Sequence, residues 1–312
     1  MSLELLRAGA LTTVQDLGRP GFAHQGVPRS GALDLEAHGR ANALVGNTRE
    51  AATLETTALG CTLRVRSPRV VAVTGARCDV FVGGVRAPWG APVRLAPGQV
   101  LEVGPAVAGL RSYVAVSGGI AVEPVLGSRS TDLLTGLGPA PLRDGDTVPL
   151  GPSGPVDDAL FGRARGGADG GAGGGADGGD GEVPGTRSGA GSDAHADPLV
   201  LPLHPGPRAD WITASSLGTL VEAVWTVSGD SNRVGVRLEG AALERARDHE
   251  LASEGMVWGA VQVPPSGRPV VFLADHPTTG GYPVVGVVDP AARSALAQAR
   301  PGDRVRFEAR PR

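Results

Sequence analysis

The middle of the chain differs sharply from the sequence on either side of it. From Gly166 to Gly191 the residues are mainly Gly, Ala and Asp, and Val183 is the single large apolar side chain. Such a segment cannot bury enough apolar surface to offset the entropy lost on ordering it. A glycine-rich phosphate cradle would need a strand before it and a helix after it, and neither pattern is present. We therefore predict a Gly/Asp-rich flexible linker at 156–197 between an N-terminal half, 1–155, and a C-terminal half, 198–312.

Both halves carry short β-branched runs that are bounded by Gly or Pro. These runs are 70–73, 79–82, 113–116 and 270–273. Gly83 and Gly84 lie between two valines, as in a two-residue hairpin turn. Many short strands at close spacing, separated by Gly and Pro turns, are typical of closed or sandwiched antiparallel sheets. The chain is therefore predicted to be mainly β.

Helix signals are few. Asp34 is a candidate N-cap for a helix that runs to Val45 and ends at Gly46. Asp289 and Pro290 form a start signal for a helix over 291–299. A third short helix is predicted over 211–217.

All 29 basic residues are Arg, because the chain contains no Lys. This excludes Schiff-base chemistry, a P-loop lysine and covalent attachment of biotin to this chain. The net charge of −3 argues against nucleic-acid and membrane-surface partners. The N-terminus lacks a signal-peptide pattern, and Cys61 and Cys78 are predicted to be core thiols. A cytoplasmic location is expected.

A long loop near the N-terminus combines glycines with Gln15, Asp16 and Arg19. Its donors and acceptors could bind a planar carboxylate or amide. The alternative is a structural loop in which Asp16 and Arg19 bind backbone groups at a barrel corner. Both interpretations stay open on sequence alone.

A second polar cluster follows the apolar run that ends at Leu273. Asp275 could orient water or bind Mg²⁺, and hydroxyl, glycine and aromatic groups follow it. These are Thr278, Thr279, Gly280, Gly281 and Tyr282. The alternative is a tight turn in which Tyr282 packs.

Arg233 and Arg237 are candidate clamps for phosphate or carboxylate, and Gln262 is a candidate orienting donor. A surface ion pair is the commoner fate of an arginine. No metal site is expected, because the six His residues do not have metal-ligand spacing.

Several motifs together resemble the biotin-dependent carboxyltransferase / allophanate hydrolase subunit 2 family. The resemblance is carried by the run TTVQDLGRPGFAHQGVPRSGALD over 12–34, by ANALVGN over 41–47, by SGGI over 117–120 and by LGSRST over 126–131. In the second half it is carried by SEG over 253–255, by 259–264 and by TTGGYP over 278–283. It covers both halves and skips the predicted linker. At Asn232 the sequence departs from the family, which usually has Asp there.

The resemblance implies two cyclophilin-like β-barrel subdomains. Within the family the sequence is most like the C components of bacterial 5-oxoprolinases. Such an enzyme opens 5-oxo-L-proline to L-glutamate with ATP, and it needs a homologous subunit, the B component, and a separate subunit, the A component. ATP, with or without Mg²⁺, would then bind here or together with a partner subunit.

The alternatives are carboxyl transfer from carboxybiotin on another protein to a urea-like amide, and a non-enzymatic regulator that binds a kinase-inhibitor homologue.

Opening a lactam requires cationic side chains that bind anions, and correctly oriented hydrogen-bond donors, more than it requires a nucleophile. On this basis the expected catalytic residues are Gln15, Asp16, Arg19 and Asp275. The residues expected to bind substrate or phosphate are Arg233, Arg237, Gln262, Thr278, Thr279, Gly280, Gly281 and Tyr282.

Overall fold

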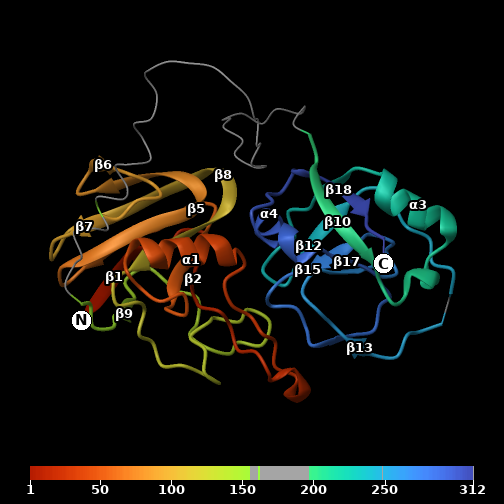
Figure 1. Cartoon of the computed structure of the whole chain (residues 1–312), viewed down its shortest axis with the longest axis horizontal. Helices are drawn as coiled ribbons and strands as arrows, with labels where there is room; N and C mark the ends of the chain where they lie inside the picture. Colours follow the sequence, from red (N-terminus) through yellow and green to blue (C-terminus); the bar gives the residue numbers. More distant parts are fainter. Residues whose placement is uncertain (155–160, 162–196, 248, 312) are drawn as a thin grey trace, which may run out of the picture.

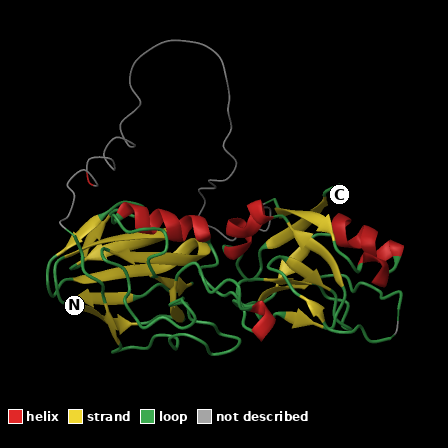
Figure 2. Cartoon of the chain, turned by 60° about the horizontal axis from the view of Figure 1, so that its bottom comes forward, coloured by secondary structure: helices red, strands yellow, loops and turns green. Residues whose placement is uncertain are grey.

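A computed structural model describes residues 1–154, 161, 197–247 and 249–311. The predicted linker, 156–197, lies outside the described residues except for Phe161 and Asp197. The described parts form two β bodies that lie side by side (Figure 1). The chain is mainly β, as predicted, and its few short helices lie at the margins of the two bodies (Figure 2).

The N-terminal sheet is a curled sheet of nine strands. Two long strands, β5 (Arg69–Val82) and β8 (Val100–Val116), pair along most of their length. Their register shifts between Gly75 and Val80, and such bulges bend a strand and increase its twist. The other strands are β1 (Ser2–Arg7), β2 (Leu11–Gln15), β3 (Thr53–Thr57), β4 (Thr62–Val65), β6 (Val85–Ala87), β7 (Val93–Leu95) and β9 (Thr147–Pro149).

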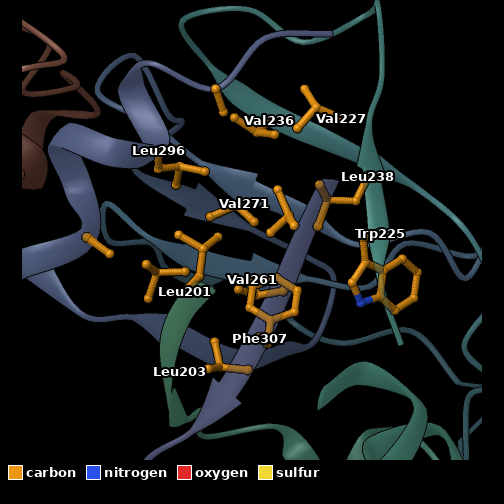
Figure 3. Packing of buried hydrophobic residues seen from close by; sticks show 14 of the residues in the cluster. Leu201, Leu203, Trp225, Val227, Val236, Leu238, Val261, Val271, Leu296 and Phe307 are labelled. Atoms are coloured by element: carbon orange, nitrogen blue, oxygen red, sulfur yellow. The ribbon is translucent and has the colours of Figure 1, made fainter. Parts of the chain in front are cut away.

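The C-terminal barrel is closed in the order β10-β17-β14-β15-β12-β11-β18. Its strands are β10 (Leu199–Pro205), β11 (Trp225–Val227), β12 (Gly235–Glu239), β14 (Ala260–Gln262), β15 (Val270–Phe272), β17 (Val284–Val288) and β18 (Arg304–Ala309). Inward side chains such as Trp225, Val236, Val261 and Phe307 meet in one buried core (Figure 3). A separate two-stranded sheet joins β13 (Glu254–Gly255) to β16 (Thr279–Gly280).

Sequence predictions that depend on interactions between neighbouring residues, such as helix caps and tight turns, are confirmed. The Asp34 side chain accepts a hydrogen bond from the Ala37 N–H and caps α1 (Leu35–Leu44). The turn at Gly83 and Gly84 joins β5 to β6, and both glycines have positive φ, which a type I′ hairpin requires. After Asp289 a 3₁₀ turn, η3 (Pro290–Ala292), leads into α4 (Arg293–Ala297).

Two expectations about element bounds were wrong. The runs 70–73 and 79–82 belong to one strand, β5, because bulges rather than a turn separate them. The predicted helix over 211–217 is split. Trp211 ends a 3₁₀ turn, η2 (Ala209–Trp211), and α3 (Ala214–Glu222) begins only after Thr213, whose hydroxyl caps it.

Both cysteines are free and buried, as predicted. Burial raises the pKa of the Cys61 thiol to about 12, so this thiol stays protonated at neutral pH. Among the described residues, no helix is long and apolar enough to cross a membrane.

Candidate functional site

The loop after β2 is held by the side chain of Asp16. One carboxylate oxygen of Asp16 accepts hydrogen bonds from the Ser128 and Ser130 hydroxyls, both at 2.6 Å, and from the Gly18 N–H at 2.8 Å. Its other oxygen accepts from the Arg129 N–H at 2.6 Å. A carboxylate with four internal donors is committed to holding two loops together, which is the structural alternative left open by the sequence.

Gln15 and Arg19 bind the same neighbouring loop. Gln15 Nε2 donates to the Thr131 carbonyl at 3.0 Å, and Arg19 donates to the carbonyls of Val125 and Ser130. Burial lowers the pKa of Arg19. Gln15 Oε1 and Arg19 Nη1 are buried and have no partner among the described residues. Neither side chain lines a described cavity.

Arg233 lies in an ion cluster between the N-terminal sheet and the C-terminal barrel. Its guanidinium donates to both oxygens of Asp275, at 2.9 and 3.0 Å, to Glu55 Oε1 and to the Gly31 carbonyl. With Arg111, which lies 3.8 Å from Glu55, these residues form the interface ion cluster: Glu55, Arg111, Arg233 and Asp275. Each of the four side chains is at most 5% exposed.

The partners of Glu55, Arg233 and Asp275 leave these three side chains little free capacity, whereas the Arg111 Nε is buried without a hydrogen bond. Burial opposes ionisation of Glu55, but Arg233 and Arg111 outweigh burial and lower its pKa. Burial likewise opposes the charge on Arg233, whose pKa is nevertheless raised by Asp275 and Glu55. Asp275 also accepts from the Ser30 hydroxyl at 2.7 Å. Arg233 and Asp275 could meet a phosphate or a metal only by breaking these bonds.

A cavity of about 280 Å³ lies beside this cluster and is lined by residues of both halves of the chain. Most of its wall is apolar, and its polar side chains are Arg29 and Ser30 from the first half and His276, Thr278 and Arg293 from the second. We call it the interface cavity. Thr278 is the one predicted binding residue that lines it.

The two arginines of the interface cavity form no ion pair among the described residues, although Asp289 is near enough to favour the charge on Arg293. Neither Arg29 nor Arg293 forms an ion pair within the described part of the chain, and the Arg293 Nε is buried without a hydrogen bond. The Arg293 guanidinium stacks 4.7 Å from the ring centre of Trp258. Burial and the nearby Arg29 charge both lower the pKa of Arg293. An anion in this cavity would relieve the repulsion between the two guanidinium groups.

His276 supplies the cavity with a neutral acceptor. Its Nδ1 lies 2.7 Å from the Pro277 carbonyl oxygen, and a carbonyl can only accept, so Nδ1 carries the proton. Nε2 is then the acceptor nitrogen of the neutral ring. Burial lowers the pKa of His276 below its ordinary value of 6.5, which keeps the ring neutral at pH 7. An anion site next to a neutral imidazole can bind a small carboxylate and accept a proton.

The remaining predicted residues lie elsewhere on the barrel. Arg237, Gln262 and Tyr282 line a separate pocket of about 190 Å³. Gly280 lies beside it, and a Cβ at this position would lie 2.6 Å from Gln262 Nε2, so the Gln262 side chain would have to move. Thr279 and Gly281 line none of the described cavities.

Sequence reasoning did not single out Arg29, His276 or Arg293. Arg29 and His276 lie inside the two polar segments that the sequence did mark, and Arg293 lies on the predicted C-terminal helix. Within the described residues, no group of three or more His, Cys, Asp or Glu side chains is placed to hold a metal ion.

The comparisons with known proteins agree on one relationship. Residues 25–309 match the family model for the carboxyltransferase domain, subdomain A and B. The chain is 37% identical over 310 residues to the C component of 5-oxoprolinase from Escherichia coli, a match that covers 98% of this chain and 90% of that protein.

Two solved structures share the fold. One is TTHA0988, with a TM-score of 0.80 and 33% identity; the match covers 98% of this chain and 55% of that one, so this chain spans about half its length. The other is the Kluyveromyces lactis urea carboxylase, with a TM-score of 0.82 and 26% identity, where 99% of this chain matches 27% of that protein.

Proposed function

Because the chain belongs to the carboxyltransferase domain family, subdomains A and B, we propose that it is one subunit of an ATP-dependent 5-oxoprolinase. This enzyme would open 5-oxo-L-proline to L-glutamate in the cytoplasm. The chain would act together with two partners, the homologous B component and the separate A component. The Escherichia coli relative that bears the 5-oxoprolinase name supports this choice, since it matches nearly the whole chain.

The interface cavity carries the proposal, because it joins two unpaired arginines to a neutral imidazole. Arg29 and Arg293 bind the carboxylate of 5-oxoproline, and the apolar wall packs against its ring methylenes. The Thr278 hydroxyl donates to the lactam oxygen. His276 Nε2 accepts a proton from the water that attacks the lactam carbon; the ring C–N bond then breaks, and the leaving nitrogen takes up the proton held by His276.

Coupling to ATP has a chemical reason. An unstrained lactam is a poor electrophile, and phosphorylation of its oxygen would make the carbon open to attack by water. The interface cavity does not fit a triphosphate, because it has only two arginines and no glycine among its described lining residues to form a backbone cradle. We therefore place ATP with a partner subunit and assign no step to it on this chain.

The test is a purification of the chain with the A and B components, followed by an assay of ATP hydrolysis with and without 5-oxo-L-proline. We expect ATP hydrolysis only when all components and 5-oxoproline are present.

Arg293→Ala is expected to raise the KM for 5-oxoproline by roughly 10–100-fold, because a charge-assisted hydrogen bond to the carboxylate is lost. Arg306→Ala on β18 is the matched control, since Arg306 is exposed and lines no described cavity. No dependence on 5-oxoproline would contradict the proposal.

Carboxyl transfer is the second candidate, and the likeness to a urea carboxylase favours it. The carboxyl donor would be carboxybiotin on another protein, since a chain without Lys cannot carry biotin. This candidate predicts that the chain transfers ¹⁴C from carboxybiotin to urea, without a requirement for 5-oxoproline. Assays of 5-oxoproline-dependent ATP hydrolysis and of ¹⁴C transfer to urea, both run on one preparation, distinguish the two functions.

A further inference from the structure

The pocket on the outside of the C-terminal barrel is separate from the interface cavity. We call it the barrel pocket, and its lining includes Arg237, Gln262, Val270, Phe272 and Tyr282. It shares no lining residue with the interface cavity. Gln262 Nε2 lies 3.4 Å from the sulfur of Met256, which lines the interface cavity, so these two side chains lie between the two spaces.

Strand alternation explains why the pocket contains polar groups. Val236, Val261 and Val271 point into the barrel core (Figure 3). Neighbouring residues of a strand point to opposite faces, so Arg237, Gln262 and Phe272 lie on the outer face. Three strands, β12, β14 and β15, therefore bring a cation, an amide and an aromatic ring to one place.

The Gln262 side chain has unused hydrogen-bonding capacity. Its Nε2 donates to the Tyr282 carbonyl at 2.9 Å, which fixes the orientation of the amide and leaves Oε1 as an acceptor. Gln262 is only 4% exposed, and among the described residues no donor reaches its Oε1. Gln262 Oε1 is not one of the buried polar atoms that lack a partner, so it is open to solvent and can accept a hydrogen bond from a ligand.

The Arg237 guanidinium is also unpaired within the described part of the chain. The backbone N–H of Arg237 is engaged, because it donates to the Ser231 hydroxyl at 3.0 Å. The guanidinium has no acidic neighbour within ion-pair distance and lies at the edge of an apolar wall that includes Val270 and Phe272. An exposed cation above a small apolar pocket is suited to a carboxylate that has a short apolar body.

We propose that the barrel pocket binds an N-acylated α-amino acid through its free carboxylate. The carboxylate pairs with Arg237, the acylated N–H donates to Gln262 Oε1, and the side chain packs on Val270 and Phe272. Two sources share this chemistry: a small free acid and the C-terminal residue of a peptide. The site is distinct from the interface cavity and does not depend on the function proposed for it.

The test is isothermal titration calorimetry of the full chain with N-acetyl-L-alanine and with its carboxamide. We expect the acid to bind at least about tenfold more tightly than the carboxamide, because only the acid can pair with a guanidinium. Arg237→Ala should weaken binding of the acid by about tenfold or more. The exposed Arg306→Ala should leave it unchanged, and so should Arg293→Ala in the interface cavity.

Trialanine, titrated in the same way, distinguishes the sources. Binding tighter than that of N-acetyl-L-alanine indicates a peptide C-terminus, and equal or weaker binding indicates a small acid. Undetectable binding of both N-acetyl-L-alanine and trialanine would overturn the proposal. Binding that Arg237→Ala leaves intact, or that Arg293→Ala abolishes, would overturn it as well.

Discussion

Replacing Arg233 with alanine is expected to lower the free energy of unfolding by about 3–5 kcal/mol, because it leaves two buried carboxylates without their main cation. Glu55 and Asp275 are at most 1% exposed, and the Arg233 guanidinium bonds to both. Removing one member of a buried ion pair leaves an uncompensated charge in a medium that solvates it poorly. The measurement is urea denaturation followed by circular dichroism.

The control for this prediction is Arg306→Ala, which removes an arginine with no ion pair among the described residues. We expect it to change the free energy of unfolding by less than about 0.5 kcal/mol. A loss of less than about 1 kcal/mol for Arg233→Ala would show that the interface ion cluster does not stabilise the fold. Any loss of activity in an Arg233 variant must therefore be compared with its stability before a role in catalysis is assigned.

Replacing His276 with alanine is expected to lower the kcat of the assembled enzyme by about 10²–10⁴-fold, the usual contribution of a general base. The base must be neutral, and burial lowers the pKa of His276 below 6.5. The wild-type rate should therefore be flat above pH 6.5 and fall as the pH decreases through this lowered pKa. His276→Ala should lose this acid limb, which a purely structural role would not produce.

The matched control is His249→Ala, because His249 is exposed and contacts the Trp211 ring in a tilted arrangement, away from the cavity lining. We expect the kcat of this variant to stay within about twofold of wild type. A His276→Ala enzyme that keeps the wild-type kcat and the wild-type acid limb would remove His276 from the mechanism.

Signals that depend on neighbouring residues could be interpreted from the sequence. Asp34 caps α1 through the N–H of Ala37, three residues away, and the turn at Gly83 and Gly84 needs only two positive φ values. In contrast, the bulges that keep β5 continuous are fixed by its pairing with β8, which lies far along the chain. The sequence of β5 alone therefore suggested two strands.

In the candidate site, too, the sequence indicated some polar residues but could not show how distant segments of the chain would bring them together. The sequence indicated that Arg233 and Asp275 are polar groups with a functional role. It did not indicate that Arg233 would form ion pairs with both Asp275 and Glu55. That outcome depends on burial between two halves of the chain, and burial cannot be read from residue type. The interface cavity collects Arg29, His276 and Arg293 from three distant segments, so only the fold brings these residues together.

The absence of Lys gains a specific meaning from the structure. The proposed substrate carboxylate is met by Arg29 and Arg293, and the Arg293 charge is held against the ring of Trp258. A guanidinium can stack and donate at the same time, which an ammonium group cannot do as well. The arginines of the interface cavity are therefore better placed to bind the anion than Arg19 or Arg233, whose donors are largely engaged with protein groups.

The most direct test of the central claim is a crystal structure of the assembled enzyme with 5-oxo-L-proline and without ATP. We expect 5-oxoproline in the interface cavity, with its carboxylate within hydrogen-bond distance of Arg29 or Arg293 and its lactam carbon on the His276 side. Ligand found only outside the interface cavity, on a partner subunit or in the barrel pocket, would contradict the claim that this cavity is the functional site.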